Sequence, residues 1–131
     1  MPVKIYMAAL FSAVSACAAT ASYVDTAPPN PPRAAASVAL LFGNGPLNCT
    51  YREIGYVEGE SRLSSPADAI NAMRREAGLR GADAIVLIDH QDPGGHHGEG
   101  GHNFAGVAIA FVGSPCTQSI LRNGRAPSPT L

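Results

Sequence analysis

The fold is decided by residues 77–88, which read Ala-Gly-Leu-Arg-Gly-Ala-Asp-Ala-Ile-Val-Leu-Ile. Residues 84–88 form a continuous apolar run, which is typical of a buried strand. Gly81 permits the positive φ with which many helices end, and the small residues beside it allow close packing of a helix on a sheet. Asp83 is expected to bond turn amides, which is a structural role. The stretch therefore predicts the end of a helix followed by a buried strand.

Upstream of this stretch the sequence predicts a helix that begins at Pro66 and ends before Gly81. Ser65 is the expected N-cap, Pro66 suits the first helical position, and Asp68 completes an arrangement like a capping box near the positive end of the helix dipole. Apolar side chains recur on one face at helical spacing, at Ile70, Met73 and Ala77. The helix therefore has one face to bury against a sheet.

Three further strands are expected on either side of this unit. Residues 37–42 (SVALLF) are a short apolar run, and residues 49–60 (CTYREIGYVEGE) are dominated by β-formers, with Gly55 marking a bulge or a close approach. Residues 104–112 (FAGVAIAFV) are expected to form an antiparallel hairpin with 84–88. The order β–β–α–β–β predicts an α+β fold, a small two-layer sandwich with one helix packed on a mostly antiparallel sheet.

The composition divides the 131-residue chain into four parts. We expect a lipoprotein signal peptide over 1–16, a lipidated Cys and Pro-rich tether over 17–37, the α+β domain over 38–117 and a flexible tail over 118–131. In the tether, four prolines are expected to exclude helix and sheet: Pro28, Pro29, Pro31 and Pro32. Fully extended, such a tether spans up to roughly 60 Å and would hold the domain off a membrane.

The first seventeen residues have the layout of a bacterial lipoprotein signal. Lys4 precedes an apolar segment, 5–16, that is shorter than the roughly 20 residues of a membrane span. Residues 14–17, Val-Ser-Ala-Cys, resemble the lipobox, which implies cleavage before Cys17 and its acylation with fatty acids such as palmitate. The next residue is Ala18 and not Asp, which by resemblance to proteobacterial lipoprotein sorting favours the outer membrane over retention in the inner membrane. The alternative is an ordinary secretory signal with an incidental cysteine.

The chain has three cysteines. If Cys17 carries lipid, Cys49 and Cys116 remain, and in an oxidising periplasm two such cysteines tend to form a disulfide. The alternative is a pair of free buried thiols.

The charge and the motifs exclude several classes of function. The formal net charge is −1 and no basic patch occurs, which argues against nucleic acid as a partner. Gly-x-Ser-x-Gly, a phosphate-binding loop and paired carboxylates on a recognisable scaffold are all absent from the sequence. We therefore expect a protein that is not an enzyme, with no catalytic residue and no required cofactor.

All four histidines lie within residues 89–102: His90, His96, His97 and His102. Imidazole and carboxylate groups suit Zn, Ni or Cu(II), so weak binding of these metals by this Gly-rich loop is one hypothesis. The alternative is a solvated polar loop between two strands.

The strand 49–60, the helix and the junction 77–87 together resemble the RcsF-like and YbjQ-like families of small bacterial envelope proteins. The resemblance covers about residues 38–113 and rests on a Cys…Ile-Gly-x-Val-x-Gly strand and an Ala…Gly-Ala-Asp-Ala-Ile junction. RcsF-like proteins have four domain cysteines, whereas Ser61 stands near the place of one of them here, which leaves one disulfide at most.

This resemblance implies a lipoprotein of the outer membrane with its domain in the periplasm or at the cell surface. It implies a non-catalytic domain that contacts other envelope proteins or senses envelope stress. The alternative function is a periplasmic metal-binding module that uses the histidine loop.

Overall fold

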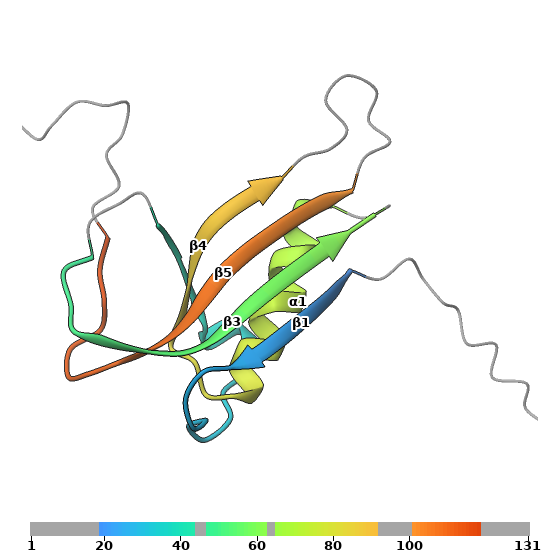
Figure 1. Cartoon of the computed structure of the whole chain (residues 1–131). Helices are drawn as coiled ribbons and strands as arrows, with labels where there is room; N and C mark the ends of the chain where they lie inside the picture. The colour runs from blue at the N-terminus through green and yellow to red at the C-terminus, as the bar shows by residue number, and fades with distance from the viewer. Residues whose placement is uncertain (1–18, 44–46, 63–64, 92–100, 119–131) are drawn as a thin grey trace, which may run out of the picture.

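A single α-helix covers one face of a five-stranded sheet in the computed structural model, which describes residues 19–43, 47–62, 65–91 and 101–118. The elements are β1 (Thr20–Asp25), a 3-10 turn (Ala35–Ser37), β2 (Ala39–Phe42), β3 (Tyr51–Ser61), α1 (Pro66–Leu79), β4 (Ala84–Gln91) and β5 (His102–Phe111). The strand order is β1-β3-β5-β4-β2, and only the β2–β4 pair among them is parallel (Figure 1). The predicted α+β class, the two-layer architecture and the mostly antiparallel sheet are confirmed.

The helix α1 forms as the sequence predicts. Its capping box is present, with the Ser65 amide donating to Asp68 Oδ2 at 3.1 Å. The chain leaves the helix through Gly81, whose φ is +74°. The helix buries its apolar face against β1, β3 and β5. The fully buried side chains at this interface come from both layers: Ile54, Val57, Met73, Ala77, Ile85 and Ala108.

Residues 20–25 form strand β1, so the prediction of a tether over 17–37 is wrong for this part. β1 pairs antiparallel with β3 from Thr20↔Glu60 to Asp25↔Gly55. The Tyr23 ring occupies the space where a Cβ at Gly55 would lie, which is the close approach predicted for this glycine. The prolines exclude a strand only from residue 28 onward, and nothing in 20–25 opposes one.

The Pro-rich segment that follows is also part of the domain, because it docks on the C-terminal end of α1. The Asn30 amide donates to the Arg80 carbonyl at 2.9 Å, and the Arg33 amide donates to the Gly78 carbonyl at 2.7 Å. Prolines have no N–H, so Asn30 and Arg33 supply donors to carbonyls that a helix end leaves unsatisfied. The domain predicted for 38–117 therefore begins at Thr20, and it extends to Gln118, whose side chain bonds the backbone of Phe42.

Asp83, at the junction of α1 and β4, uses both its backbone and its side chain. Its amide donates to the Ile109 carbonyl at 2.9 Å, and its carbonyl accepts from the Ala39 amide at 3.0 Å. Its Oδ2 accepts from the Phe111 amide at 2.7 Å, and its Oδ1 forms an ion pair with Arg33. The predicted structural role is confirmed, although the bonded side-chain partner is a strand amide and not a turn amide.

The hairpin β4–β5 is longer than the sequence predicts. Asp89, His90 and Gln91 continue β4, and His102 begins β5, although all four were expected in the loop. The backbone ladder continues through these polar residues, for example at Gln91↔Asn103. Their side chains are largely solvated, so polarity does not oppose strand formation there.

The docking of the Pro-rich segment makes Gly78 sensitive to substitution. A Cβ at Gly78 would lie 2.7 Å from the Arg33 carbonyl oxygen. A Gly→Ala substitution inside a helix ordinarily raises the free energy of unfolding by up to about 1 kcal/mol. At Gly78 the clash should instead lower the free energy of unfolding by about 1–2 kcal/mol. Urea unfolding of Gly78→Ala measures this difference.

Asn71→Ala is the matched control, because Asn71 is exposed on the same helix. It should stabilise slightly, by up to about 0.5 kcal/mol. A Gly78→Ala variant that gains stability would show that the segment 30–33 does not dock on the helix.

Candidate functional site: the open face of the sheet

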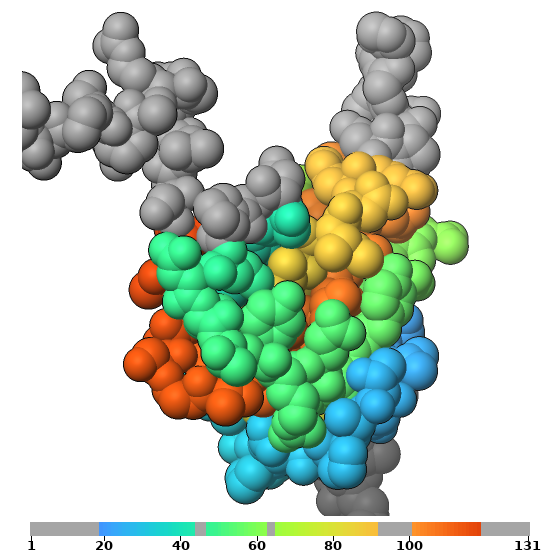
Figure 2. Space-filling model, turned by 60° about the vertical axis from the view of Figure 1, so that its left-hand side comes forward, coloured from blue at the N-terminus to red at the C-terminus, as the bar shows by residue number. Residues whose placement is uncertain are grey.

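The face of the sheet opposite α1 carries rows of polar side chains at one end. The strand registers align two rows across β1, β3, β5 and β4. The first row consists of Ser22, Glu58, Ala105 and Asp89. The second row consists of Thr20, Glu60, Asn103 and Gln91. Figure 2 shows this face, with β4 (yellow), β5 (orange), β3 (green) and β1 (blue) side by side.

These rows line a shallow groove of about 640 Å³, which we call the open groove. Its walls and floor come from four strands: Thr20, Ala21, Ser22, Tyr56, Glu58, Gly59, Glu60, Asp89, Gln91, Asn103, Phe104 and Ala105. Ala105 lies between Glu58 and Asp89 in its row, so its small side chain leaves space between longer ones. The groove therefore forms because the strand register places the small side chain of Ala105 between the longer side chains of Glu58 and Asp89.

The open groove is acidic. It contains the carboxylates of Glu58, Glu60 and Asp89. Arg62 donates to Glu60 at 2.8 Å, and Gln91 donates to Asp89 at 3.2 Å. Among the described residues, Glu58 and Asp89 take part in no ion pair. The groove therefore presents net negative charge to whatever approaches it.

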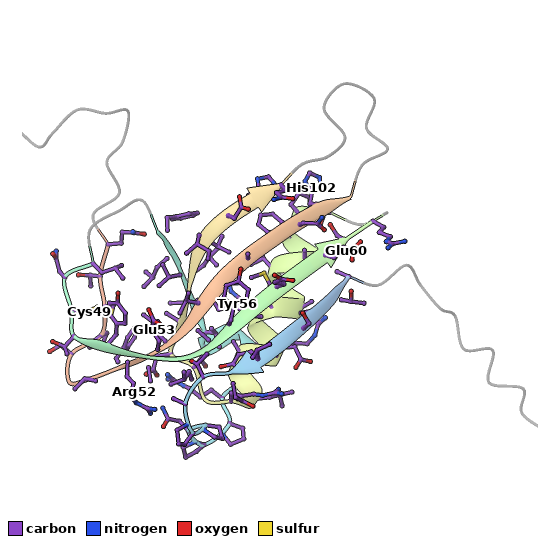
Figure 3. The ribbon with its side chains drawn as sticks, viewed as in Figure 1. Cys49, Arg52, Glu53, Tyr56, Glu60 and His102 are labelled. Atoms are coloured by element: carbon purple, nitrogen blue, oxygen red, sulfur yellow. A yellow bond between two sulfur atoms is a disulfide. The ribbon has the colours of Figure 1, made fainter. Side chains whose placement is uncertain are left out.

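The other half of this face is covered by the disulfide-bonded segments. Cys49 and Cys116 form the predicted disulfide, with their Cα atoms 4.8 Å apart. The bridge lies over a second apolar cluster that includes Leu41 and Ile109, and no helix of the described residues covers this side. Figure 3 places Cys49 at the opposite end of the sheet from Glu60 and His102. The bridged segments therefore cover apolar side chains at the end of this face opposite the groove.

Two of the four predicted metal-binding histidines come together on the helix side of the sheet. His90 Nε2 lies 3.4 Å from His102 Nδ1, and the His90 ring stacks on Phe104 with centroids 4.3 Å apart. His96 and His97 lie outside the described residues. Within the described part of the chain, no three His, Cys, Asp or Glu side chains are grouped as metal ligands would be.

The predicted signal peptide and Cys17 also lie outside the described residues. In the part of the chain that the structure covers, no helix is both long and apolar enough to span a bilayer.

The carboxylates of the open groove were not predicted from the sequence as a site. The signal for them is the alternation of Tyr56, Glu58 and Glu60 with buried residues of β3. A bulge between Glu53 and Gly55 reverses this alternation part-way along the strand, so the pattern read from residue 51 onward is lost.

Comparison with solved structures gives one distant match to the described fold. It is the crystal structure of FvfA, a Francisella virulence factor, with a TM-score of 0.50 and 19% identity over 69% of this chain and 96% of that chain. At this identity the likeness shows the shared fold. Neither protein-family models nor curated proteins match the chain.

The disulfide should contribute a large part of the stability of the domain. It closes a loop of 67 residues, for which the chain-entropy model gives about 4 kcal/mol. The double variant Cys49→Ala/Cys116→Ala should therefore unfold at a much lower urea concentration than the oxidised protein. The reduced wild-type protein is the control and should match the variant, whereas equal midpoints for all three samples would contradict the contribution.

Proposed function

We propose that this chain is an outer-membrane lipoprotein, anchored through lipid on Cys17, whose domain binds another envelope protein without catalysing a reaction. The observation that carries the proposal is the open groove, an acidic depression that the described residues leave open on one face of the sheet. The lipobox-like segment supports the anchor, and the disulfide fits an oxidising compartment. The resemblance to RcsF-like proteins extends the proposal to sensing of envelope stress.

The charge of the groove indicates the chemistry of the partner. Glu58 and Asp89 face the groove, and neither is neutralised by a cation of the described residues. Complementary charge increases both the rate and the specificity of association. We therefore propose that the partner places Lys or Arg side chains of a surface segment in the groove.

Binding is a better use of this surface than catalysis. Enzyme sites usually enclose most of the substrate, so that water is excluded and electrostatic interactions are strong. The open groove is a shallow depression on a sheet face, and its carboxylates stay in contact with solvent. Such a surface suits a protein segment laid across the strands.

Charge reversal in the groove tests the interaction. In cells that express the full chain, Glu58→Lys/Asp89→Lys should lower the yield of crosslinked envelope partner by roughly tenfold, because attraction of about 0.2–1 kcal/mol per exposed pair becomes repulsion of similar size. The readout is mass spectrometry of formaldehyde-crosslinked envelopes after affinity capture.

Glu53→Lys is the matched control, since Glu53 is an exposed glutamate of the same strand outside the groove lining. It should retain the partner. The anchor is tested separately by Cys17→Ser, which should release the protein from the membrane fraction. If Glu58→Lys/Asp89→Lys captured as much partner as the wild-type protein, the proposed interface would be wrong.

The contact between His90 and His102 favours metal binding as a second candidate function. Their ring nitrogens lie close enough that a small rotation could direct both at one ion, and the segment between the two strands supplies His96 and His97. Imidazole groups bind Zn, Ni and Cu(II) well.

Titration of the lipid-free domain with Zn, Ni and Cu tests this function by calorimetry. We expect saturable micromolar binding that is lost in His90→Ala/His102→Ala and weakened in His96→Ala/His97→Ala. His90→Gln is a further control that keeps a polar side chain on the strand but removes the imidazole. Absence of saturable binding, or equal binding by all variants, would rule out the metal-binding function.

A further inference from the structure

The sheet begins very close to the residue proposed to carry the lipid. Cys17 and Thr20, the first residue of β1, are separated by three residue steps. An extended chain spans at most about 3.6 Å per residue, so the Cα atoms of Cys17 and Thr20 lie within roughly 11 Å. This limit is far below the reach expected of a free tether over 17–37.

Strand β1 is held firmly in the domain. It forms a continuous antiparallel ladder with β3 over all six of its residues. On its helix side, the Arg80 guanidinium lies 4.7 Å from the centre of the Tyr23 ring and 3.8 Å from the Asp25 carboxylate. Burial, followed by the charge of Asp25, raises the pKa of the Tyr23 phenol, as expected for a side chain packed between layers. The anchor is therefore joined to the rigid sheet and not to a loose arm.

One end of the sheet is nearest to this anchor. Thr20 lies beside Glu60, and the row continues through Asn103 to Gln91, so β1 enters the sheet where β3 and β4 end and β5 begins (Figures 1 and 3). The other end of the sheet carries Phe111 and the disulfide. It lies about 30 Å away, because the ten residues of β5 rise about 3.4 Å each.

We infer that the anchored domain rests directly on the bilayer surface, with the Thr20–Gln91 row of the sheet against the lipid headgroups. This inference rests on the proposed lipidation of Cys17. The exposed Arg62, which pairs with Glu60, lies beside this row, and the groove opens sideways along the membrane. The partner of the groove must therefore present its basic segment at the membrane surface, and a protein reached only across the periplasm cannot occupy it.

Quenching of fluorescence by spin-labelled headgroups measures this proximity. The full lipidated chain is reconstituted in phosphatidylethanolamine and phosphatidylglycerol vesicles that contain a headgroup nitroxide lipid, with a maleimide fluorophore at Arg62→Cys or at Val112→Cys. Both positions are exposed, and Val112 follows the far end of β5. We expect a clear loss of fluorescence at position 62 and no loss at position 112. Mass spectrometry confirms that Cys49 and Cys116 stay bridged in both labelled proteins.

A longer connection provides the second arm of the experiment. Insertion of a Gly-Ser linker of about twenty residues between Ala18 and Ala19 adds a mean reach of about 25 Å. Quenching at position 62 should then fall to the level at position 112, while the protein stays on the vesicles.

The outcomes separate this inference from the proposed function. Intact mass first establishes acylation of Cys17, and a chain without acyl groups overturns both the anchor and the inference. If Cys17 is acylated but positions 62 and 112 are quenched equally, or if the linker changes nothing, the anchor stands and the placement of the domain on the bilayer is wrong.

Discussion

The carboxylate of Asp83 is the interaction on which the rest of the domain depends. Asp83 lies where α1 ends and β4 begins. Its backbone groups bond β2 and β5, and its carboxylate bonds β5 and the Pro-rich segment. A short polar side chain at this point satisfies the Phe111 amide and the Arg33 guanidinium, which belong to parts of the chain far apart in sequence. An isosteric amide could still accept these hydrogen bonds but would carry no charge to pair with Arg33. The junction therefore sets where the Pro-rich segment meets the sheet.

The two faces of the sheet are covered by different means. One helix is enough for one face, because small residues such as Ala69, Ala77 and Gly59 let α1 approach β3 closely. On the other face the chain has no second helix within the described residues, so two short segments joined by a disulfide cover half of it. A domain this small gains little from its core alone, so we expect the covalent link to supply a large share of its stability. Among the described residues, the open groove lies in the part of this face that these segments leave uncovered.

Local signals in the sequence predicted much of this fold. Ser65, Asp68 and Gly81 act through neighbouring residues, so the helix and its ends were predictable. The disulfide was predictable from the number of cysteines and the inferred compartment. Strand β1 was not, because it is a short edge strand that pairs with β3 some thirty-five residues away, and pairing at that distance leaves no local pattern. The groove was missed for a related reason, since its rows exist only once four strands are in register.

The two faces also keep the two candidate functions apart. Asp89 and His90 are neighbours on β4, so their side chains point to opposite sides of the sheet. Asp89 lines the groove, whereas His90 stacks on Phe104 on the helix side. A metal ion held by His90 and His102 would therefore not draw on the groove carboxylates, and a basic segment in the groove would not displace it. Because both sites lie at the end of the sheet where β1 begins, the proposed lipid on Cys17 would hold both near the same membrane surface, and a substitution at one site would leave the other intact.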